Sequence, residues 1–150
     1  MNIFLTSGLI KKYLKNEELF VSLFTTEFVK SNLGLYKKVN MVPYSNITIR
    51  DLLRVSKLDL NDKKRINNIT YEILKRSGFD PESKLLWLQI QNRNSIEFTQ
   101  QYENPNEISK EEFFLKNYMV SQKNRSGIKY EKNSSRGFYR FKKYVERIHE

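Results

Sequence analysis

The sequence contains no cysteine and one histidine, and these two shortages exclude several kinds of chemistry. Without thiols the chain has neither a disulfide framework nor a thiolate nucleophile, which favours a cytoplasmic location. The one histidine, His149, lies in a segment that we expect to be frayed, where it suits neither a zinc site nor a histidine-based dyad. We therefore expect no metal and no cofactor.

Glycine is scarce as well, at five residues, and no glycine-rich loop of the kind that cradles phosphates is present. The carboxylates are scattered, without the close pairing that two-metal catalysis needs. No apolar run approaches the roughly 20 residues that cross a bilayer. Lys11 and Lys12 follow the first apolar stretch instead of preceding it, so we expect no secretory signal. These absences argue against most enzymes and against a membrane protein.

Positive charge is what the sequence has in excess. Its 27 Lys and Arg residues outnumber 17 Asp and Glu residues, which gives a net charge of +10. Such a surplus favours a polyanionic partner, meaning nucleic acid, an acidic protein surface or anionic lipid. Lipid is the least favoured of the three, because the chain has no long apolar segment.

Residues 1–40 have the pattern of two helices. Thr6 or Ser7 can cap the first helix, and Asn16 can cap the second, because their side chains can accept from the unpaired N–H groups of a first helical turn. A connector with Pro43 follows, which indicates a boundary between residues 1–40 and 41–150. The alternative is one compact domain over residues 1–150.

Residues 47–79 have the pattern of a helix-turn-helix. Thr48 can cap a short first helix, Asp62 can cap a longer second one, and Gly78 suits the left-handed residue after its end. Lys and Arg on the second helix can neutralise phosphates, and Asn can pair with a base edge. The alternative is an ordinary amphipathic helix with a solvated polar face. The side chains that we expect to contact DNA from this helix are Lys63, Lys64, Arg65, Asn67, Asn68, Tyr71 and Lys75.

Two later stretches have the pattern of β-hairpins. Leucine or isoleucine at 86, 88 and 90 alternates with other residues, as in a strand, and Arg93 would lie at the hairpin tip. Residues 127–141 would form a second hairpin, whose aromatics either stack on bases or pack inward. Its candidate contacts to nucleic acid are Lys129, Arg136, Arg140, Lys142 and Lys143. Either hairpin suits a wing, so we expect a mostly helical α+β, winged-helix-like fold with two extra N-terminal helices.

Residues 47–79 also resemble a known module. The short helix, then Leu58-Asp59-Leu60, then a helix ending Ile73-Leu74-Lys75-Arg76-Ser77-Gly78-Phe79, is similar to the helix-turn-helix of phage and genomic-island replication proteins of the virulence-associated E and primase-helicase type. In related modules a segment like Ser135-Arg136-Gly137-Phe138-Tyr139-Arg140-Phe141 is the wing. The resemblance implies DNA attachment by a mobile-element protein, without replication chemistry.

The sequence therefore predicts a non-enzymatic DNA-binding protein of a phage or mobile element, with double-stranded DNA as the first expected partner. One alternative is a small, anti-CRISPR-like inhibitor that binds a host nucleic-acid-processing or defence protein. Another is a metal-independent ribonuclease toxin, in which Arg136, Tyr139 and Arg140, with Lys142 nearby, would act as acid and base.

Overall fold

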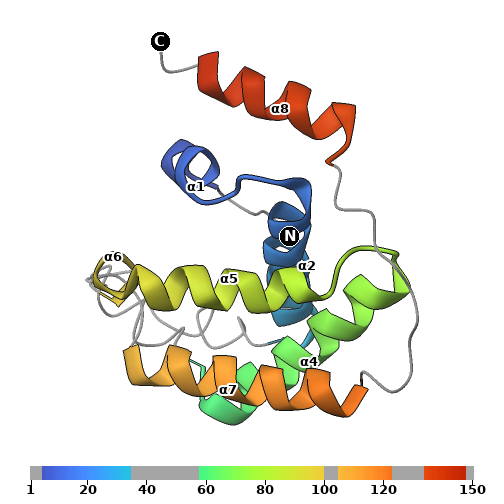
Figure 1. Ribbon diagram of the computed structural model, residues 1–150, viewed down its shortest axis with the longest axis vertical. Coiled ribbons are helices and arrows are strands. Elements are labelled where there is room, and N and C mark those ends of the chain that lie inside the picture. Colours follow the sequence, from blue (N-terminus) through green and yellow to red (C-terminus); the bar gives the residue numbers. More distant parts are fainter. Residues whose placement is uncertain (1–4, 35–57, 100–104, 123–133, 148–150) are drawn as a thin grey trace.

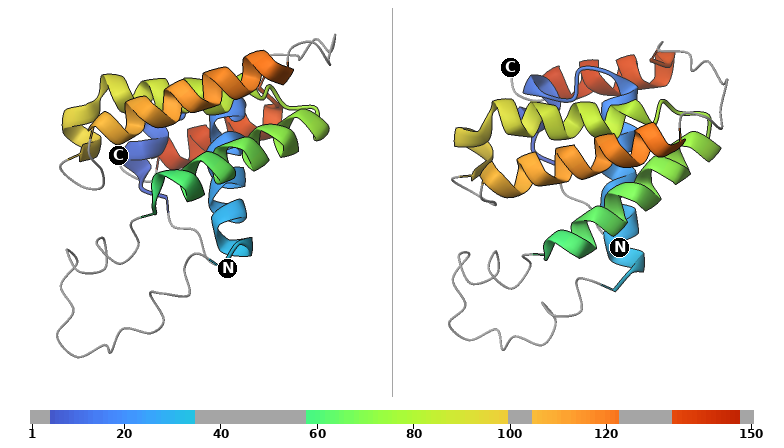
Figure 2. Two further views of the ribbon diagram at one scale, coloured as in Figure 1. Left: turned by 90° about the horizontal axis from the view of Figure 1, so that it is seen from below. Right: turned by 60° about the horizontal axis from the view of Figure 1, so that its bottom comes forward.

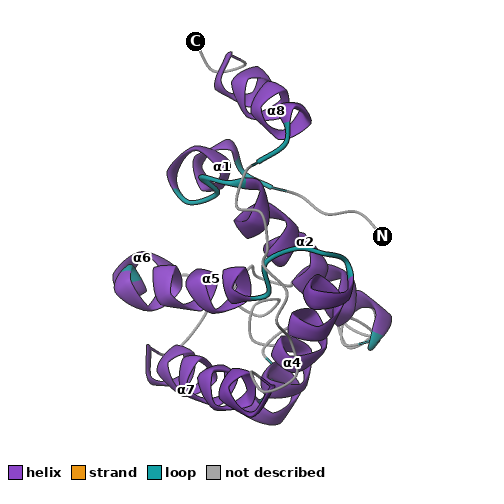
Figure 3. Ribbon diagram, turned by 45° about the vertical axis from the view of Figure 1, so that its right-hand side comes forward, coloured by secondary structure: helices purple, strands orange, loops and turns teal. Residues whose placement is uncertain are grey.

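The computed structural model describes residues 5–34, 58–99, 105–122 and 134–147, and every regular element in these ranges is a helix (Figures 1 and 3). The helices are α1 (Ser7–Lys12), α2 (Glu17–Asn32), α4 (Leu60–Arg76), α5 (Glu82–Arg93), α6 (Ser95–Thr99), α7 (Pro105–Gln122) and α8 (Arg136–Arg147). The predicted α+β, winged-helix-like fold is therefore wrong for the described residues, which form a helical bundle. None of these helices is long and apolar enough to cross a membrane.

The predicted helix ends are mostly correct. Thr6 caps α1 by accepting from the Leu9 N–H at 3.2 Å. Asn16 caps α2 by accepting from the Leu19 N–H at 2.9 Å. Gly78 follows α4 with a φ of 78°, which confirms the left-handed residue expected there. Short-range hydrogen bonds at helix ends thus follow directly from residue type.

Helix α4 begins earlier than predicted. Its cap is Asp59, whose carboxylate accepts from the Asp62 N–H at 2.7 Å, so Asp62 lies inside the helix. The short helix expected over residues 47–56 lies outside the described residues, as does the proposed boundary between residues 40 and 41.

The first predicted hairpin is wrong, because residues 82–99 form α5 and α6. The run Leu85–Leu88 is apolar at consecutive positions, so it fits a period of two as well as one of 3.6. In the structure Lys84 and Leu88, four residues apart, are both buried, whereas Leu86 is 41% exposed. The Glu, Lys and Gln residues around this run favour helix over strand.

The second predicted hairpin is also wrong where the structure describes it. Residues 136–147 form helix α8, and residues 127–133 lie outside the described ranges. Phe138 is buried, and Val145, seven residues later and two turns along the helix, is half-buried. The aromatic residues here therefore follow a helical period, not the alternation of a strand.

Helices α2, α4, α5 and α7 pack into a bundle, with α5 and α7 side by side and antiparallel (Figures 1 and 2). Helix α2 packs against α4 and α5, so the N-terminal helices are part of the same packed structure. Helix α1 lies between this bundle and α8, which is the outermost helix at one end of the molecule (Figure 1).

Two apolar clusters form the core. One contains Ile10, Leu14, Leu19 and Trp87, and Val145 of α8 packs against it. The other contains Tyr71, Leu88, Leu115 and Met119. Helix α5 contributes Trp87 to the first cluster and Leu88 to the second, so it connects the two. Each fully buried side chain of this size contributes about 1.5–3 kcal/mol to folding.

Candidate nucleic-acid interface

Three of the side chains predicted to contact DNA from α4 lie in the interior. Lys63, Asn67 and Tyr71 are each at most 5% exposed. The Lys63 ammonium lies 3.1 Å from a carboxylate oxygen of Glu107 and 3.1 Å from one of Glu111. Asn67 donates from its amide to Glu111 at 3.0 Å. Lys63 and Asn67 also line a cavity of about 120 Å³ inside the bundle. Their placement therefore corrects the prediction that these three side chains face a DNA groove.

The rest of the predicted α4 contacts remain at the surface. Lys64 and Arg65 are exposed, whereas Asn68 and Lys75 are half-buried. The Lys64 ammonium lies 5.0 Å from the ring centre of Phe114 on α7, within the range of a cation–π contact. What remains on α4 is a small basic area beside α7, without the row of base-reading side chains that we expected.

The other predicted contacts lie outside α4. Arg93 is exposed in the last turn of α5, so it is not at a hairpin tip, and Lys129 lies outside the described residues. The remaining four lie together on one helix, α8: Arg136, Arg140, Lys142 and Lys143.

Helix α8 is fastened at its first turn to the first turn of α2. The Ser135 hydroxyl accepts from the Phe138 N–H at 3.2 Å, which caps α8. The same hydroxyl donates to one Glu17 carboxylate oxygen at 3.0 Å, and the Ser135 N–H donates to the other. In return the Glu17 N–H donates to the Ser134 hydroxyl at 2.9 Å. Hydrogen bonds between residues that are 117 or more positions apart in the sequence thus fix where α8 begins.

The inner face of α8 is apolar and already packed. The Phe20 ring of α2 lies 6.0 Å from the Phe138 ring and 5.5 Å from the Phe141 ring, measured between ring centres. Val145 packs against the core cluster one turn further on. At the far end the Lys11 ammonium of α1 donates to the Glu146 carbonyl at 3.3 Å. The opposite face of α8 therefore points away from the protein.

That outer face carries a row of cations, which we call the basic face. It consists of Arg136, Arg140, Lys143 and Arg147. Steps of four, three and four residues place all of them on one side of a helix, over about 16 Å. All four are exposed, and none has a carboxylate partner in the described part of the chain. Exposed Tyr139 and Tyr144 flank the row.

Sequence reasoning found three of these four cations but missed Arg147. The signal was their helical spacing, which was overlooked because residues 138–141 were interpreted as a strand. Lys142 was also predicted as a contact; it is half-buried and lies off the basic face.

Among the described residues, charge differs between the two ends of the molecule. Residues 5–15 and 134–147, the α1–α8 layer, contain eight Lys or Arg and one acid, Glu146, which makes a net charge of +7. The described residues of the other helices, 16–34, 58–99 and 105–122, contain ten Lys or Arg and twelve Asp or Glu, which makes −2. In the part of the chain that the structure describes, the positive potential is therefore strongest at one end.

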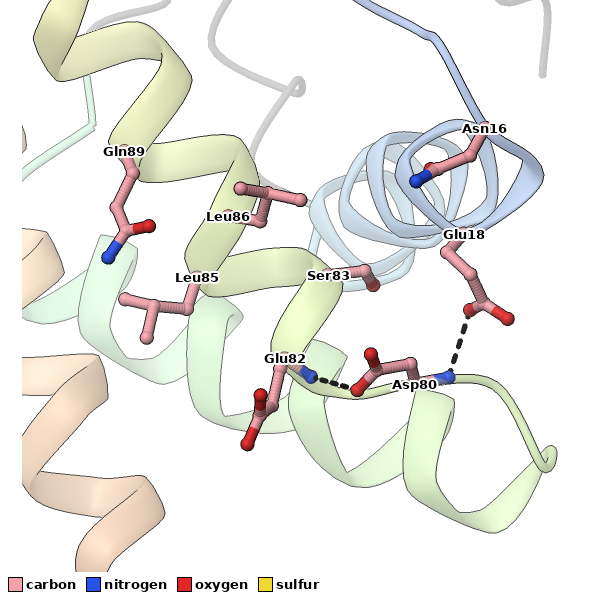
Figure 4. Close-up of a pocket in the computed structure, with 8 residues that line it drawn as sticks. All are labelled: Asn16, Glu18, Asp80, Glu82, Ser83, Leu85, Leu86 and Gln89. Carbon is pink, nitrogen blue, oxygen red and sulfur yellow. Dashed lines mark hydrogen bonds between the residues drawn. The ribbon is translucent and has the colours of Figure 1, made fainter. Parts of the chain in front are cut away.

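A hollow of about 330 Å³ at the junction of α2 and α5 has the opposite character (Figure 4). Its carboxylates are Glu18, Asp80 and Glu82, and Leu85 and Leu86 form its apolar wall. Burial raises the pKa of Glu18 above its usual 4.5, and the nearby carboxylate of Asp80 raises it as well. The hydrogen bond that Glu18 accepts from the Asp80 N–H acts in the opposite direction and lowers this pKa. This hollow repels phosphates, so it is not part of a nucleic-acid interface.

No protein-family model matches the chain, and no curated protein or solved structure is significantly similar to it. The resemblance of residues 47–79 to a replication-protein module stays a prediction. Residues 136–141, expected to form its wing, are helical.

Proposed function

We propose that the protein binds nucleic acid, without catalysing a reaction, through the basic face of α8. The observation that carries the proposal is the row of Arg136, Arg140, Lys143 and Arg147 on the outermost helix, with no carboxylate to neutralise it in the described part of the chain. Phosphates bound by such a row release condensed counterions, and this release drives association. The remainder of the α1–α8 layer strengthens the attraction.

An anionic membrane is a weaker candidate for the same helix. A basic amphipathic helix binds a membrane by burying its apolar face among the lipids. In α8 that face is in use, since Phe138 is 5% exposed and packs on Phe20 of α2. The charged face with its tyrosines, and the exposed part of Phe141 beside it, are left for a partner.

The placement of the candidate catalytic residues gives little support to the ribonuclease alternative. Its candidate residues Arg136, Tyr139 and Arg140 lie along the exposed side of one helix, and neither of the two hollows described above includes them. Acid–base catalysis needs groups held around a reacting bond. A row on a protruding helix supports binding instead.

The test compares two variants of equal charge. One replaces the four cations of the basic face by glutamine (R136Q, R140Q, K143Q and R147Q). The control replaces four exposed cations elsewhere (K64Q, R65Q, R76Q and R93Q). Both have a net charge of +6, since each loses four of the +10. Glutamine keeps a helix propensity close to that of lysine and arginine, so α8 should stay folded.

Binding would be measured by fluorescence anisotropy against random-sequence DNA and RNA over a range of salt concentrations. We expect the α8 variant to bind at least about tenfold more weakly than the control. Its plot of log affinity against log salt should be shallower by about 3, because each lost phosphate contact removes about 0.7–0.9 from the slope. Equal losses in both variants would mean that net charge alone governs binding. No binding of the wild type at low salt would overturn the proposal and favour an acidic protein partner.

A further inference from the structure

Two tyrosines are exposed beside the basic face. Tyr139 is 59% exposed and Tyr144 is 66% exposed. At about 100° per residue, each lies about 70° from the midline of the row of cations, one on either side. Neither phenol hydroxyl is bonded within the described part of the chain. The outward half of α8 is therefore a charged strip with an aromatic ring along each edge.

The aromatic surface continues past one edge. Phe141 lies three residues before Tyr144 and is 38% exposed. Its ring centre is 5.5 Å from that of Phe20, which in turn lies 6.4 Å from the Phe24 ring in a stacked arrangement. Phe24 is 47% exposed. Rings accessible to a partner thus extend from α8 onto α2.

The side chains of α8 can read the edges of paired bases only in part. Arginine and lysine can pair with guanine in a duplex groove, but asparagine and glutamine, which pair with adenine, are absent from α8. Asn67, which we expected to fill this role, is buried and bonded to Glu111. Helix α8 therefore presents cations that can bind phosphates and exposed aromatic rings on which planar groups can stack.

We infer that the nucleic acid is single-stranded, with its phosphates along the basic face and its unpaired bases stacked on Tyr139 and Tyr144. This inference rests on the proposed function. In a duplex each base face is covered by the next base pair, so the tyrosine rings have no free base face on which to stack. In a single strand each base presents a free face, and a base stacked on an aromatic ring strengthens binding by roughly 5- to 150-fold. Stacking does not depend on sequence, so binding should tolerate any sequence rich in unpaired bases.

The experiment compares an oligothymidylate of roughly 12 nucleotides, the matching oligouridylate and a duplex of equal length. The variants are Y139A/Y144A and the conservative Y139F/Y144F, which keeps the rings. Phe113→Ala on α7 is the matched control, because Phe113 is also 59% exposed but lies on α7, on the far side of the bundle from α8. The two single strands show whether DNA or RNA is preferred.

We expect the wild type to bind a single strand more tightly than the duplex at equal salt. Y139A/Y144A should lose at least about tenfold in single-strand affinity and little in duplex affinity, while Y139F/Y144F and F113A bind as the wild type does. A phosphate–sugar chain without bases should bind wild type and Y139A/Y144A equally. Tighter duplex binding, or no effect of Y139A/Y144A, would overturn this inference. It would leave the proposed function intact as long as the loss of the α8 cations still weakens binding.

Discussion

Lys63 and Glu111 are charged residues that the bundle holds in its interior. Their side chains are 5% and 8% exposed, and Lys63 has a second partner in Glu107, which is 29% exposed. Removing such charges from water costs several kcal/mol, which the pairing and the hydrogen bond from Asn67 offset. Loss of Glu111 leaves a large part of that cost without compensation, although Lys63 keeps its ion pair with Glu107.

Glu111→Ala should therefore lower the free energy of unfolding by about 3 kcal/mol, because Lys63 and Asn67 lose their shared acceptor. Lys116→Ala is the control. Lys116 pairs with Glu112 at 2.6 Å but is 49% exposed, so its loss should cost less than about 1 kcal/mol. Urea denaturation of the two variants measures the difference. Equal, small losses would show that the interior network is not held together by Glu111.

This network explains why the buried side of α4 was misassigned. Ile66, Ile69 and Ile73 recur at helical spacing, which by itself indicates an inward stripe, yet Ile69 and Ile73 are half-buried. The helix is rotated so that Lys63 and Asn67 face inward, toward glutamates that lie 44 residues away in the sequence. A local pattern has no information about such distant partners. It did predict the caps Thr6 and Asn16, because a cap is bonded two or three residues away, although it placed the cap of α4 at Asp62 instead of Asp59.

Hydrogen bonds at its first turn help to hold helix α8 in place. Its cap, Ser135, serves both α8 and the Glu17 carboxylate of α2. Ser135→Ala should therefore weaken α8 by about 1 kcal/mol and leave the bundle unchanged. In hydrogen exchange, we expect α8 amides to exchange about fivefold faster, while those of α5 and α7 keep their protection.

Ser121→Ala is a suitable comparison for that experiment. The Ser121 hydroxyl also bonds to the main chain of its helix, donating to the Tyr118 carbonyl at 2.6 Å. Ser121 lies near the end of α7, and within the described residues its hydroxyl bonds to no other helix. Faster exchange throughout the bundle in Ser135→Ala, or none in α8, would contradict the role assigned to Ser135.

Helices α5 and α8 also show where a single sequence is ambiguous. Both contain apolar residues close together, and a short run of them fits a strand or a helix equally well. Packing decides between the two. Helix α5 lies between α2 and α7 and buries residues on both sides, whereas α8 buries Phe138 and half-buries Val145. The basic composition of the sequence therefore indicated the candidate site, but it did not indicate that the site lies on a helix.

The whole molecule should unfold as one unit, because α5 contributes to both core clusters. Trp87, the one tryptophan, is 4% exposed and belongs to the cluster beneath α1 and α8. Its fluorescence reports that cluster, whereas far-ultraviolet circular dichroism reports all helices. During urea denaturation the two signals should have the same midpoint. Two separate midpoints would instead favour a division of the chain into independently folding parts.

The net charge of +10 predicted a polyanionic partner, but not where that charge would be. Among the described residues, positive charge is concentrated at one end, in the α1–α8 layer with its net charge of +7, so the described part of the molecule has an electric dipole moment along its long axis (Figure 1). If the partner is a nucleic acid, as proposed, we expect the molecule to turn in the field of the polyanion before contact, so that most encounters begin with α8 in front. The described residues of the other helices, with a net charge of −2, would then be held away from the phosphates, and association would be fast and oriented.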